Sequence, residues 1–364
     1  MNKYSDLLFR CLKAALFEER LDVEVFSGLD RGQWDGLYAL AKRQGLGSIV
    51  FEALSKQADE IRIPQDLKMK WIAMTMNVEK WYGRQFAAAS SFADLMASDG
   101  VDIAVLKGIA MSSYYPVPSH RECGDLDCFL GMNGIWGAGY ENGNVLAENA
   151  GASVERDFYK HSHIRYKGLE IENHQFCLAI RGSREMKRLE RHLRKIIMKD
   201  GKRYIGDTKL LNPSADFNAL FLTLHSFTHF LSEGLNLRQI ADWVLLLKHE
   251  QNKIDWAEFY RWCDDLSLTR FVNTLNHIAV DCFGLKLSEA AVKTDSTYAG
   301  RILDDCFNLN GVFNKGYSPW KARMVMIVKR LAFSWKYHKI YRRSVTVALM
   351  KLVGGFIFEQ DPKL

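Results

Sequence analysis

One segment of the chain, residues 105–130, holds two aspartates whose type and spacing could bind a metal ion. Asp125 and Asp127 are separated by a single residue, and side chains two positions apart on a β-strand project from the same face. Two carboxylates on one face repel each other unless a cation lies between them. Carboxylate oxygens suit Mg²⁺ or Mn²⁺, which also bind the phosphates of substrates. The pair therefore predicts a site for a divalent metal ion.

The turn upstream of these aspartates predicts an anion site. Lys107 and Gly108 follow a short apolar run and lead directly into residues that favour one or two helical turns. The first backbone N–H groups of a helix attract anions, and a glycine lets a phosphate approach the backbone closely. Lys107 and Arg121 would add positive charge, and Ser112 lies one turn further along. We expect Lys107, Gly108, Ser112 and Arg121 to bind the phosphates of a nucleotide.

A third carboxylate is expected from the later segment LEIENHQF, residues 169–176. By the same two-residue rule, Glu170, Glu172 and His174 share one face of this strand. Either glutamate could complete the metal site, and we favour Glu172 because it adjoins the centre of the strand. Metal-binding carboxylates beside an anion-binding turn are what the transfer of a nucleotidyl group requires. The predicted catalytic and metal-binding residues are Asp125, Asp127 and Glu172.

The order of these motifs resembles that of a known family. Leu106-Lys107-Gly108 is followed by Tyr115-Pro116, Arg121 and the run Gly124–Leu130. This order is similar to that of the nucleotidyltransferase fold of the DNA polymerase β superfamily, and more closely to the bacterial family called uncharacterised nucleotidyltransferases. The later elements of the resemblance are Glu172 with His174, then His225, His229, Leu237-Arg238 and Asp242 on helical segments. Together these elements cover roughly residues 100–250.

The resemblance implies that the hydroxyl of an acceptor attacks the α-phosphate of an NTP and that pyrophosphate is released. Asp125 and Asp127 would hold Mg²⁺ or Mn²⁺, and Glu172 would orient or deprotonate the acceptor. The acceptor stays open between a small molecule, a protein side chain and an RNA end. Gly108 is followed by Ile109, where the superfamily has Gly-Ser or Gly-Gly. This departure keeps open an alternative, a catalytically degenerate nucleotide-binding or interaction protein on the same fold.

Four histidines are further candidates for the site. His225 and His229 are four residues apart on a predicted helix, a spacing that can chelate a metal ion. No third ligand is identifiable beside them, so we expect buried helix histidines bonded to Asp242 or to the backbone. His161 and His163 share one face of a predicted strand and could approach the aspartates.

The elements that must position these residues form three regions. Residues 1–98 have the three- and four-residue apolar spacing of helices. Residues 99–180 contain short β-branched and apolar runs and predict a small mixed-sheet core. Residues 181–364 are helical again, so the predicted fold is α/β (α+β), a nucleotidyltransferase core flanked by N- and C-terminal helical domains. Within the core we expect strands at 101–106, 125–130, 153–159, 163–166 and 169–178, and a helix over 133–150.

A basic segment follows the core. Residues 181–199 include eight lysines and arginines, which we interpret as the solvated face of a helix. A second alternative, an RNA-binding module built on this segment, would show an affinity for RNA that falls steeply with salt. The net charge of the whole chain is only +6, from 49 basic and 43 acidic residues, so nucleic acid is not the favoured partner.

The overall composition is that of an ordinary globular protein. Of the 364 residues, 48% are hydrophobic, which excludes disordered and collagen-like chains. The seven cysteines include no CxxC pair, so a reducing compartment is expected rather than a zinc ribbon or a disulfide framework. The most apolar stretch, Ser344–Phe358, is interrupted by Lys351. Because a membrane-spanning helix needs about 20 apolar residues, we expect a cytoplasmic protein without a transmembrane segment.

Overall fold

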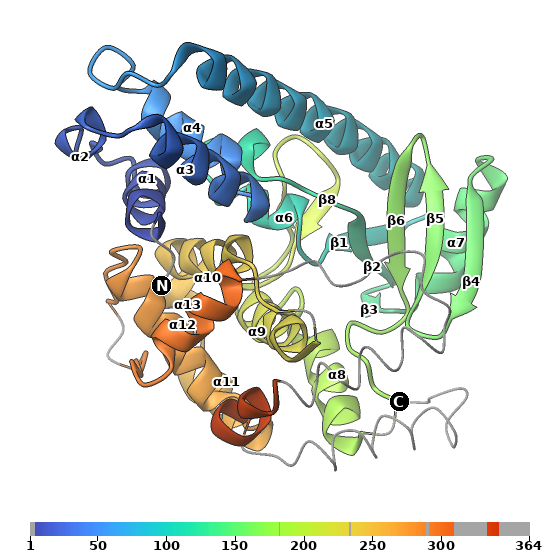
Figure 1. Cartoon of the computed structure of the whole chain (residues 1–364). Helices are drawn as coiled ribbons and strands as arrows, with labels where there is room; N and C mark the ends of the chain where they lie inside the picture. The colour runs from blue at the N-terminus through green and yellow to red at the C-terminus, as the bar shows by residue number, and fades with distance from the viewer. Residues whose placement is uncertain (1–3, 182, 233, 289–290, 309–332, 342–364) are drawn as a thin grey trace.

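The structure is a computed structural model that describes residues 4–181, 183–232, 234–288, 291–308 and 333–341. Within these residues, helices surround a mixed sheet (Figure 1). The helices before the sheet are α1 (Ser5–Phe17), α2 (Glu24–Ser27), α3 (Arg31–Arg43), α4 (Gly47–Ser55) and α5 (Gln65–Ala97). The strands are β1 (Val101–Val105), β2 (Leu126–Met132), β3 (Ile135–Trp136), β4 (Ser153–Phe158), β5 (His161–Tyr166), β6 (Leu169–His174), β7 (Arg203–Tyr204) and β8 (Leu210–Asn212).

Further helices lie between and after these strands. Those between strands are α6 (Ile109–Ser112), the 3-10 turn η1 (Pro118–His120), α7 (Tyr140–Asn149) and α8 (Arg184–Ile196). Those after the last strand are α9 (Ala215–Ser232), α10 (Leu237–Glu250), η2 (Gln251–Lys253), α11 (Trp256–Asp265), α12 (Thr269–Asp281), α13 (Ala299–Phe307) and the short η3 (Lys336–Tyr341).

The strands pair in the order β4-β5-β6-β2-β1-β8-β7, and β3 pairs with the end of β2. Strand β2 is central, antiparallel to β1 and parallel to β6. At one edge β4, β5 and β6 form an antiparallel meander. Because β2 is buried on both faces, its residues 126–130 are apolar with the single exception of Asp127.

The long helix α5 covers one face of the sheet. Its Ala88, Phe92 and Met96 recur at four-residue spacing and form one stripe of the helix. This stripe packs in one hydrophobic cluster with Ile103 of β1 and Cys128 of β2. These apolar side chains are therefore the part of α5 that contacts this face of the sheet.

The opposite face is covered by the C-terminal helices. Ala104 of β1 and Phe129 of β2 belong to the same hydrophobic cluster as Leu193 of α8 and Phe217 of α9. Since side chains alternate between faces along a strand, Asp127 projects from this second face together with Phe129. The face with the aspartate therefore looks toward the C-terminal half of the chain.

The structure confirms the predicted α+β class with flanking helices and all five predicted strands of the core. Two details were wrong. The helix expected over 133–150 occupies only Tyr140–Asn149, because the glycine-rich residues before it form turns and the short strand β3. The sheet also continues past residue 180, since β8 pairs in parallel with β1. Strands of two or three residues are too short to show a period-two pattern.

Two further predictions concern transmembrane helices and disulfide bonds. The apolar stretch Ser344–Phe358 lies outside the described residues. Among the helices that the structure does describe, none combines the length and the apolarity needed to cross a bilayer. All seven cysteines carry free thiols.

Candidate active site

Strand pairing brings four of the candidate side chains together. The parallel register of β2 and β6 places Asp127 directly opposite Glu172. The antiparallel register of β5 and β6 places His161 opposite His174. Because paired residues and residues two apart share a face, all four project from the same side of the sheet. We call Asp127, His161, Glu172 and His174 the acid–imidazole cluster.

His174 joins the two acids of this cluster. Its Nε2 atom lies 3.2 Å from Asp127 Oδ1 and 3.3 Å from Glu172 Oε2. Its Nδ1 atom lies 3.2 Å from the carbonyl oxygen of Phe176, which only accepts, so Nδ1 carries a proton. His161 Nδ1 lies 3.4 Å from Glu172 Oε2, without the geometry of a hydrogen bond. Three of the four side chains are buried, and Glu172 keeps 22% of its side chain exposed, so solvent reaches the cluster at Glu172.

The turn after β1 brings a positive charge to the cluster. Lys107 Nζ lies 3.1 Å from Asp127 Oδ2. Gly108 has φ +56° and ψ −110°, a backbone conformation that residues with a Cβ rarely adopt. A Cβ there would meet only the backbone oxygen of Asp125, at 3.8 Å. The glycine is therefore needed for its backbone angles, and not for space. The helix α6 that follows has a single turn, so its dipole contributes little.

Asp125 adds a third carboxylate from the loop before β2. It precedes the strand by one residue and is largely exposed. Partial burial and the charges of Glu172 and Asp127 raise the pKa of the Asp125 carboxyl, although Lys107 counteracts them. A raised carboxyl pKa marks a position where negative charges crowd, which a bound cation would relieve.

The other two carboxylates depend on cationic neighbours. Burial by itself would raise the pKa of Asp127, but the hydrogen bond to His174 and the charge of Lys107 hold it well below its ordinary value. Burial also acts to raise the pKa of Glu172, and the contacts with His174 and His161 lower it overall. Both acids are therefore ionised near neutral pH.

One family of known proteins matches this chain. The sequence profile of the family described as "Uncharacterised nucleotidyltransferase" matches residues 30–284, well over half of the chain. The chain belongs to this family. The match extends further in both directions than the motifs at 100–250 and takes in the helices from α3 to α12. No curated protein sequence and no solved structure gave a match.

In this member of the family, one predicted phosphate ligand forms its hydrogen bonds inside the fold. Ser112 is fully buried. Its hydroxyl donates to the carbonyl oxygen of Ile109 at 2.7 Å and lies 2.9 Å from the hydroxyl of Tyr82 on α5. The structure therefore does not bring the Ser112 hydroxyl to the acid–imidazole cluster, and Ser112 has no part in the function proposed below.

Arg121, the second cationic candidate, forms a buried ion pair. Its Nε donates to Asp242 Oδ1 at 2.8 Å and a terminal guanidinium nitrogen donates to Asp242 Oδ2 at 2.7 Å. The hydroxyl of Tyr115 donates to the same Oδ1 at 2.8 Å. We call these three residues the Arg121 cluster. All three belong to the motifs of the resemblance, and here they join the loop before β2 to helix α10.

Of the two candidate glutamates, only Glu172 lies in the acid–imidazole cluster. Glu170 lies opposite Arg165 on β5, and Arg165 Nε donates to Glu170 at 2.6 Å on an exposed part of the sheet. Glu170 and Glu172 are two residues apart on β6, but Glu170 belongs to an exposed ion pair, whereas Glu172 lies opposite Asp127.

The structure places the four candidate histidines in different surroundings. Asp242, one of the partners expected for His225 or His229, binds Arg121 and Tyr115. The rings of His225 and His229 contact each other with centroids 4.5 Å apart. Burial, together with the charge of Lys107, holds the pKa of His225 well below its ordinary value. His225 therefore approaches the Lys107 side of the cluster from helix α9.

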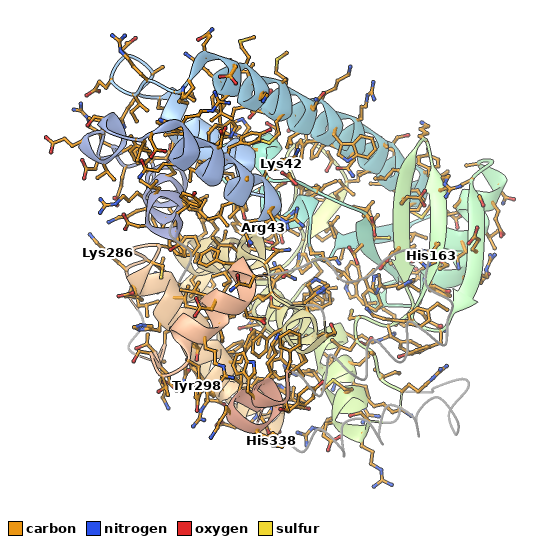
Figure 2. All side chains as sticks on the ribbon, viewed as in Figure 1. Lys42, Arg43, His163, Lys286, Tyr298 and His338 are labelled. Atoms are coloured by element: carbon orange, nitrogen blue, oxygen red, sulfur yellow. The ribbon has the colours of Figure 1, made fainter. Side chains whose placement is uncertain are left out.

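His161 and His163, by contrast, stand side by side on β5. Their ring centroids are 4.7 Å apart. His161 belongs to the acid–imidazole cluster, while His163, labelled in Figure 2, is exposed.

Sequence reasoning missed Lys160, in the turn between β4 and β5. Burial lowers the pKa of its ammonium group, and the charges of Asp127 and Glu172 act in the opposite direction. Lys160 therefore lies within electrostatic reach of both acids. The sequence offers no signal for this, since a lysine in a polar hairpin is usually a surface residue.

The donor groups of the candidate site fit a divalent metal ion. Asp125, Asp127 and Glu172 offer the carboxylate oxygens that Mg²⁺ and Mn²⁺ prefer. The position of Lys107 beside Asp127 shows that positive charge is stabilised there. His161 and His174 add imidazole nitrogens, and the ligand atoms of His161, Glu172 and His174 all lie within 4.8 Å of one another.

Proposed function

We propose that this protein transfers a nucleoside monophosphate from an NTP to a hydroxyl group of an acceptor, with release of pyrophosphate. Membership of the nucleotidyltransferase family supports nucleotide transfer in general. The observation that carries the finer proposal is the position of Glu172, directly opposite Asp127 and partly open to solvent. A carboxylate in this position lies beside the other acids and is accessible to an incoming hydroxyl.

Each residue has a defined role in the proposed step. The acceptor oxygen bonds to the α-phosphorus, the bond from the α-phosphorus to the bridging oxygen of the β-phosphate breaks, and the hydroxyl proton passes to Glu172. Lys107 and the backbone at Gly108 stabilise the negative charge of the departing pyrophosphate. Asp125 and Asp127 hold Mg²⁺ or Mn²⁺, which when bound neutralises charge on the phosphates.

Pyrophosphate release by the purified full-length protein tests this proposal. Each NTP, labelled at the γ-phosphate so that released pyrophosphate carries the label, is supplied with Mg²⁺ or Mn²⁺ and a small-molecule cell extract as the mixture of acceptors. We expect Glu172→Gln to lower the rate by about 10²- to 10⁴-fold, the range that a positioned general base contributes. Nucleotide affinity should change little, because Glu172 acts on the acceptor.

Glu170→Gln is the matched control for this experiment. Glu170 lies on the same strand and the same face, but its partner is the exposed Arg165. The control variant should release pyrophosphate at the wild-type rate. Equal losses in the two variants would contradict the assignment of Glu172 as the base.

One observation favours the alternative of nucleotide binding without catalysis. The turn residues 107–111 carry no hydroxyl side chain, and the nearby Ser112 hydroxyl is engaged with Ile109 and Tyr82. A turn of this kind could hold a nucleotide yet position its terminal phosphate poorly. NTP binding without turnover of any NTP would support this alternative.

The basic helix α8 gives less support to the RNA-binding alternative. Arg188 pairs with Asp265, and Arg194 pairs with Glu190 at 2.9 Å. Because these charges are partly neutralised within the protein, the attraction of the helix for a polyanion is reduced.

A further inference from the structure

The two histidines of the acid–imidazole cluster suggest a second ligand, in addition to the NTP and the Mg²⁺ or Mn²⁺ of the proposed function. We propose that His161, Glu172 and His174 bind a divalent transition-metal ion of the class that prefers imidazole, represented by Zn²⁺. Their ligand atoms lie within 4.8 Å of one another. Two nitrogens and one carboxylate oxygen form a donor set typical of Zn²⁺, whereas Mg²⁺ takes oxygen ligands.

The distances within this set already approach those around a bound ion. Around a tetrahedral ion with bonds of about 2.1 Å, neighbouring ligand atoms are about 3.4 Å apart. Glu172 Oε2 lies 3.3 Å from His174 Nε2 and 3.4 Å from His161 Nδ1. Two of the three distances between ligand atoms therefore match this geometry. Both are measured from Glu172 Oε2 to a histidine nitrogen.

The surroundings of His174 indicate which of its nitrogens would bind. Its Nδ1–H donates to the carbonyl oxygen of Phe176, so Nε2 is the nitrogen that faces two carboxylate oxygens and can bind a proton or a metal ion. Lone pairs facing one another are unfavourable unless a proton or a cation lies between them. A backbone carbonyl on the far nitrogen is also the usual partner of a metal-bound histidine, because it fixes the ring and its tautomer.

His161 supplies an independent observation. Its side chain is buried, with 8% of the residue exposed, and Nδ1 is a buried atom with no hydrogen-bond partner among the described residues. Buried polar atoms are almost always paired, so an unpaired one requires an explanation. Nδ1 lies beside Glu172, where a metal ion would satisfy both groups.

Metal binding to the stripped full-length protein, without nucleotide, tests the proposal. Zn²⁺ affinity is measured by competition with a chromophoric chelator, and Co²⁺ serves as a spectroscopic probe. We expect one Zn²⁺ per chain that a large excess of Mg²⁺ does not displace, and a visible Co²⁺ absorption typical of low coordination number. Displacement of Zn²⁺ by Mg²⁺ would overturn the proposal.

Two neighbouring histidines provide the matched variants. His161→Ala should weaken Zn²⁺ binding by at least about 100-fold, because even outer partners of a metal site contribute 10- to 100-fold. His163→Ala, two residues along the same strand, should change the affinity by less than about twofold, because His163 lies outside the converging set. Equal effects of the two variants, or none from His161→Ala, would overturn the assignment. Circular dichroism and thermal melting, with His161→Gln as a second variant, separate loss of a ligand from loss of the fold.

The outcome is distinguishable from that of the proposed function, although the two share Glu172. Zn²⁺ binding without nucleotidyl transfer would leave this inference standing and remove the proposed function. Transfer with Mg²⁺ in a protein that does not bind Zn²⁺ would do the reverse.

Discussion

The acid–imidazole cluster and the Arg121 cluster are both buried polar groups, and they balance their charges differently. In the Arg121 cluster one guanidinium meets one carboxylate through two hydrogen bonds, and Tyr115 donates a third to Asp242. Positive and negative charges are equal in number, and both oxygens of Asp242 are bonded. A buried pair of this kind supports the fold as long as both partners remain.

The acid–imidazole cluster has an excess of acceptors. Asp127 and Glu172 lie opposite each other on adjacent strands, and their charges help to raise the pKa of Asp125. His161 Nδ1 has no hydrogen bond within the described part of the chain. Two lysines face these three carboxylates: Lys107 pairs with Asp127, and Lys160 lies within electrostatic reach of Asp127 and Glu172. A cluster with balanced charges and complete hydrogen bonds holds secondary-structure elements together. A cluster with more negative than positive charge is suited to bind a cation. The comparison thus gives two neighbouring motif residues, Arg121 and Asp127, different roles.

The largest expected effect comes from breaking the Arg121 cluster. Asp242→Asn should lower the free energy of unfolding by about 3–5 kcal/mol, because it leaves the buried Arg121 without its counter-charge. Urea denaturation measures this loss. Arg165→Ala, which breaks the exposed pair with Glu170, is the control and should cost less than about 1 kcal/mol. A variant at Asp242 as stable as wild type would remove the structural role assigned to the cluster.

Asp125→Asn tests whether the acidic residues of the candidate site, unlike the Arg121 cluster, serve activity and not the stability of the fold. It should lower nucleotidyl transfer by about 10²-fold, because a metal ligand is lost. The melting temperature without metal should stay equal or rise, since partial burial and the charges of Glu172 and Asp127 raise the pKa of Asp125. Activity and thermal melting of one preparation measure both effects. A lower melting temperature would show that Asp125 supports the fold.

Gly108→Ala tests the turn that carries Lys107. The substitution should cost about 1–3 kcal/mol of stability, because alanine must adopt the backbone angles at φ +56°. Gly83→Ala is the control, on an exposed part of helix α5 with open space around the glycine. It should raise stability by about 0.5–1 kcal/mol through better helix propensity. Similar outcomes at the two positions would mean that the turn is not restricted by its backbone.

The smallest expected effect is a pH dependence next to the Arg121 cluster. His120 Nδ1 lies 2.9 Å from Glu52, and Nε2 lies 3.0 Å from Glu79. Burial lowers the pKa of His120, but the two carboxylates raise it overall. The stabilisation is therefore complete below about pH 6.5, the ordinary histidine pKa, and is lost as pH rises through the raised value.

Urea denaturation of wild type and His120→Gln across this pH range measures the effect. The stability difference should shrink as pH rises, by less than about 1 kcal/mol, since Glu79 is partly exposed. A difference that does not change with pH would show that protonated His120 contributes no stability.

Much of the fold could be predicted from the sequence because its signals are local. Strands β1 and β2 are short, mainly apolar runs, and period-two alternation predicted that Glu172 and His174 share a face. The strands β7 and β8 could not be predicted, because they have two and three residues and depend on pairing with the existing sheet.

The sequence by itself determined which residues are the candidates for the site: two aspartates, a glycine turn with Lys107, and an acidic strand with a histidine. Only the tertiary structure decided between Glu170 and Glu172, because the register of β6 against β2 selects the partner of Asp127. It also decided the roles of Arg121 and His161. The partner of Arg121 is 121 residues away on α10, and His161 joins the acids through the pairing of β5 with β6. Spacing along the chain fixes which face a side chain occupies, but the charge that it meets depends on elements distant in sequence.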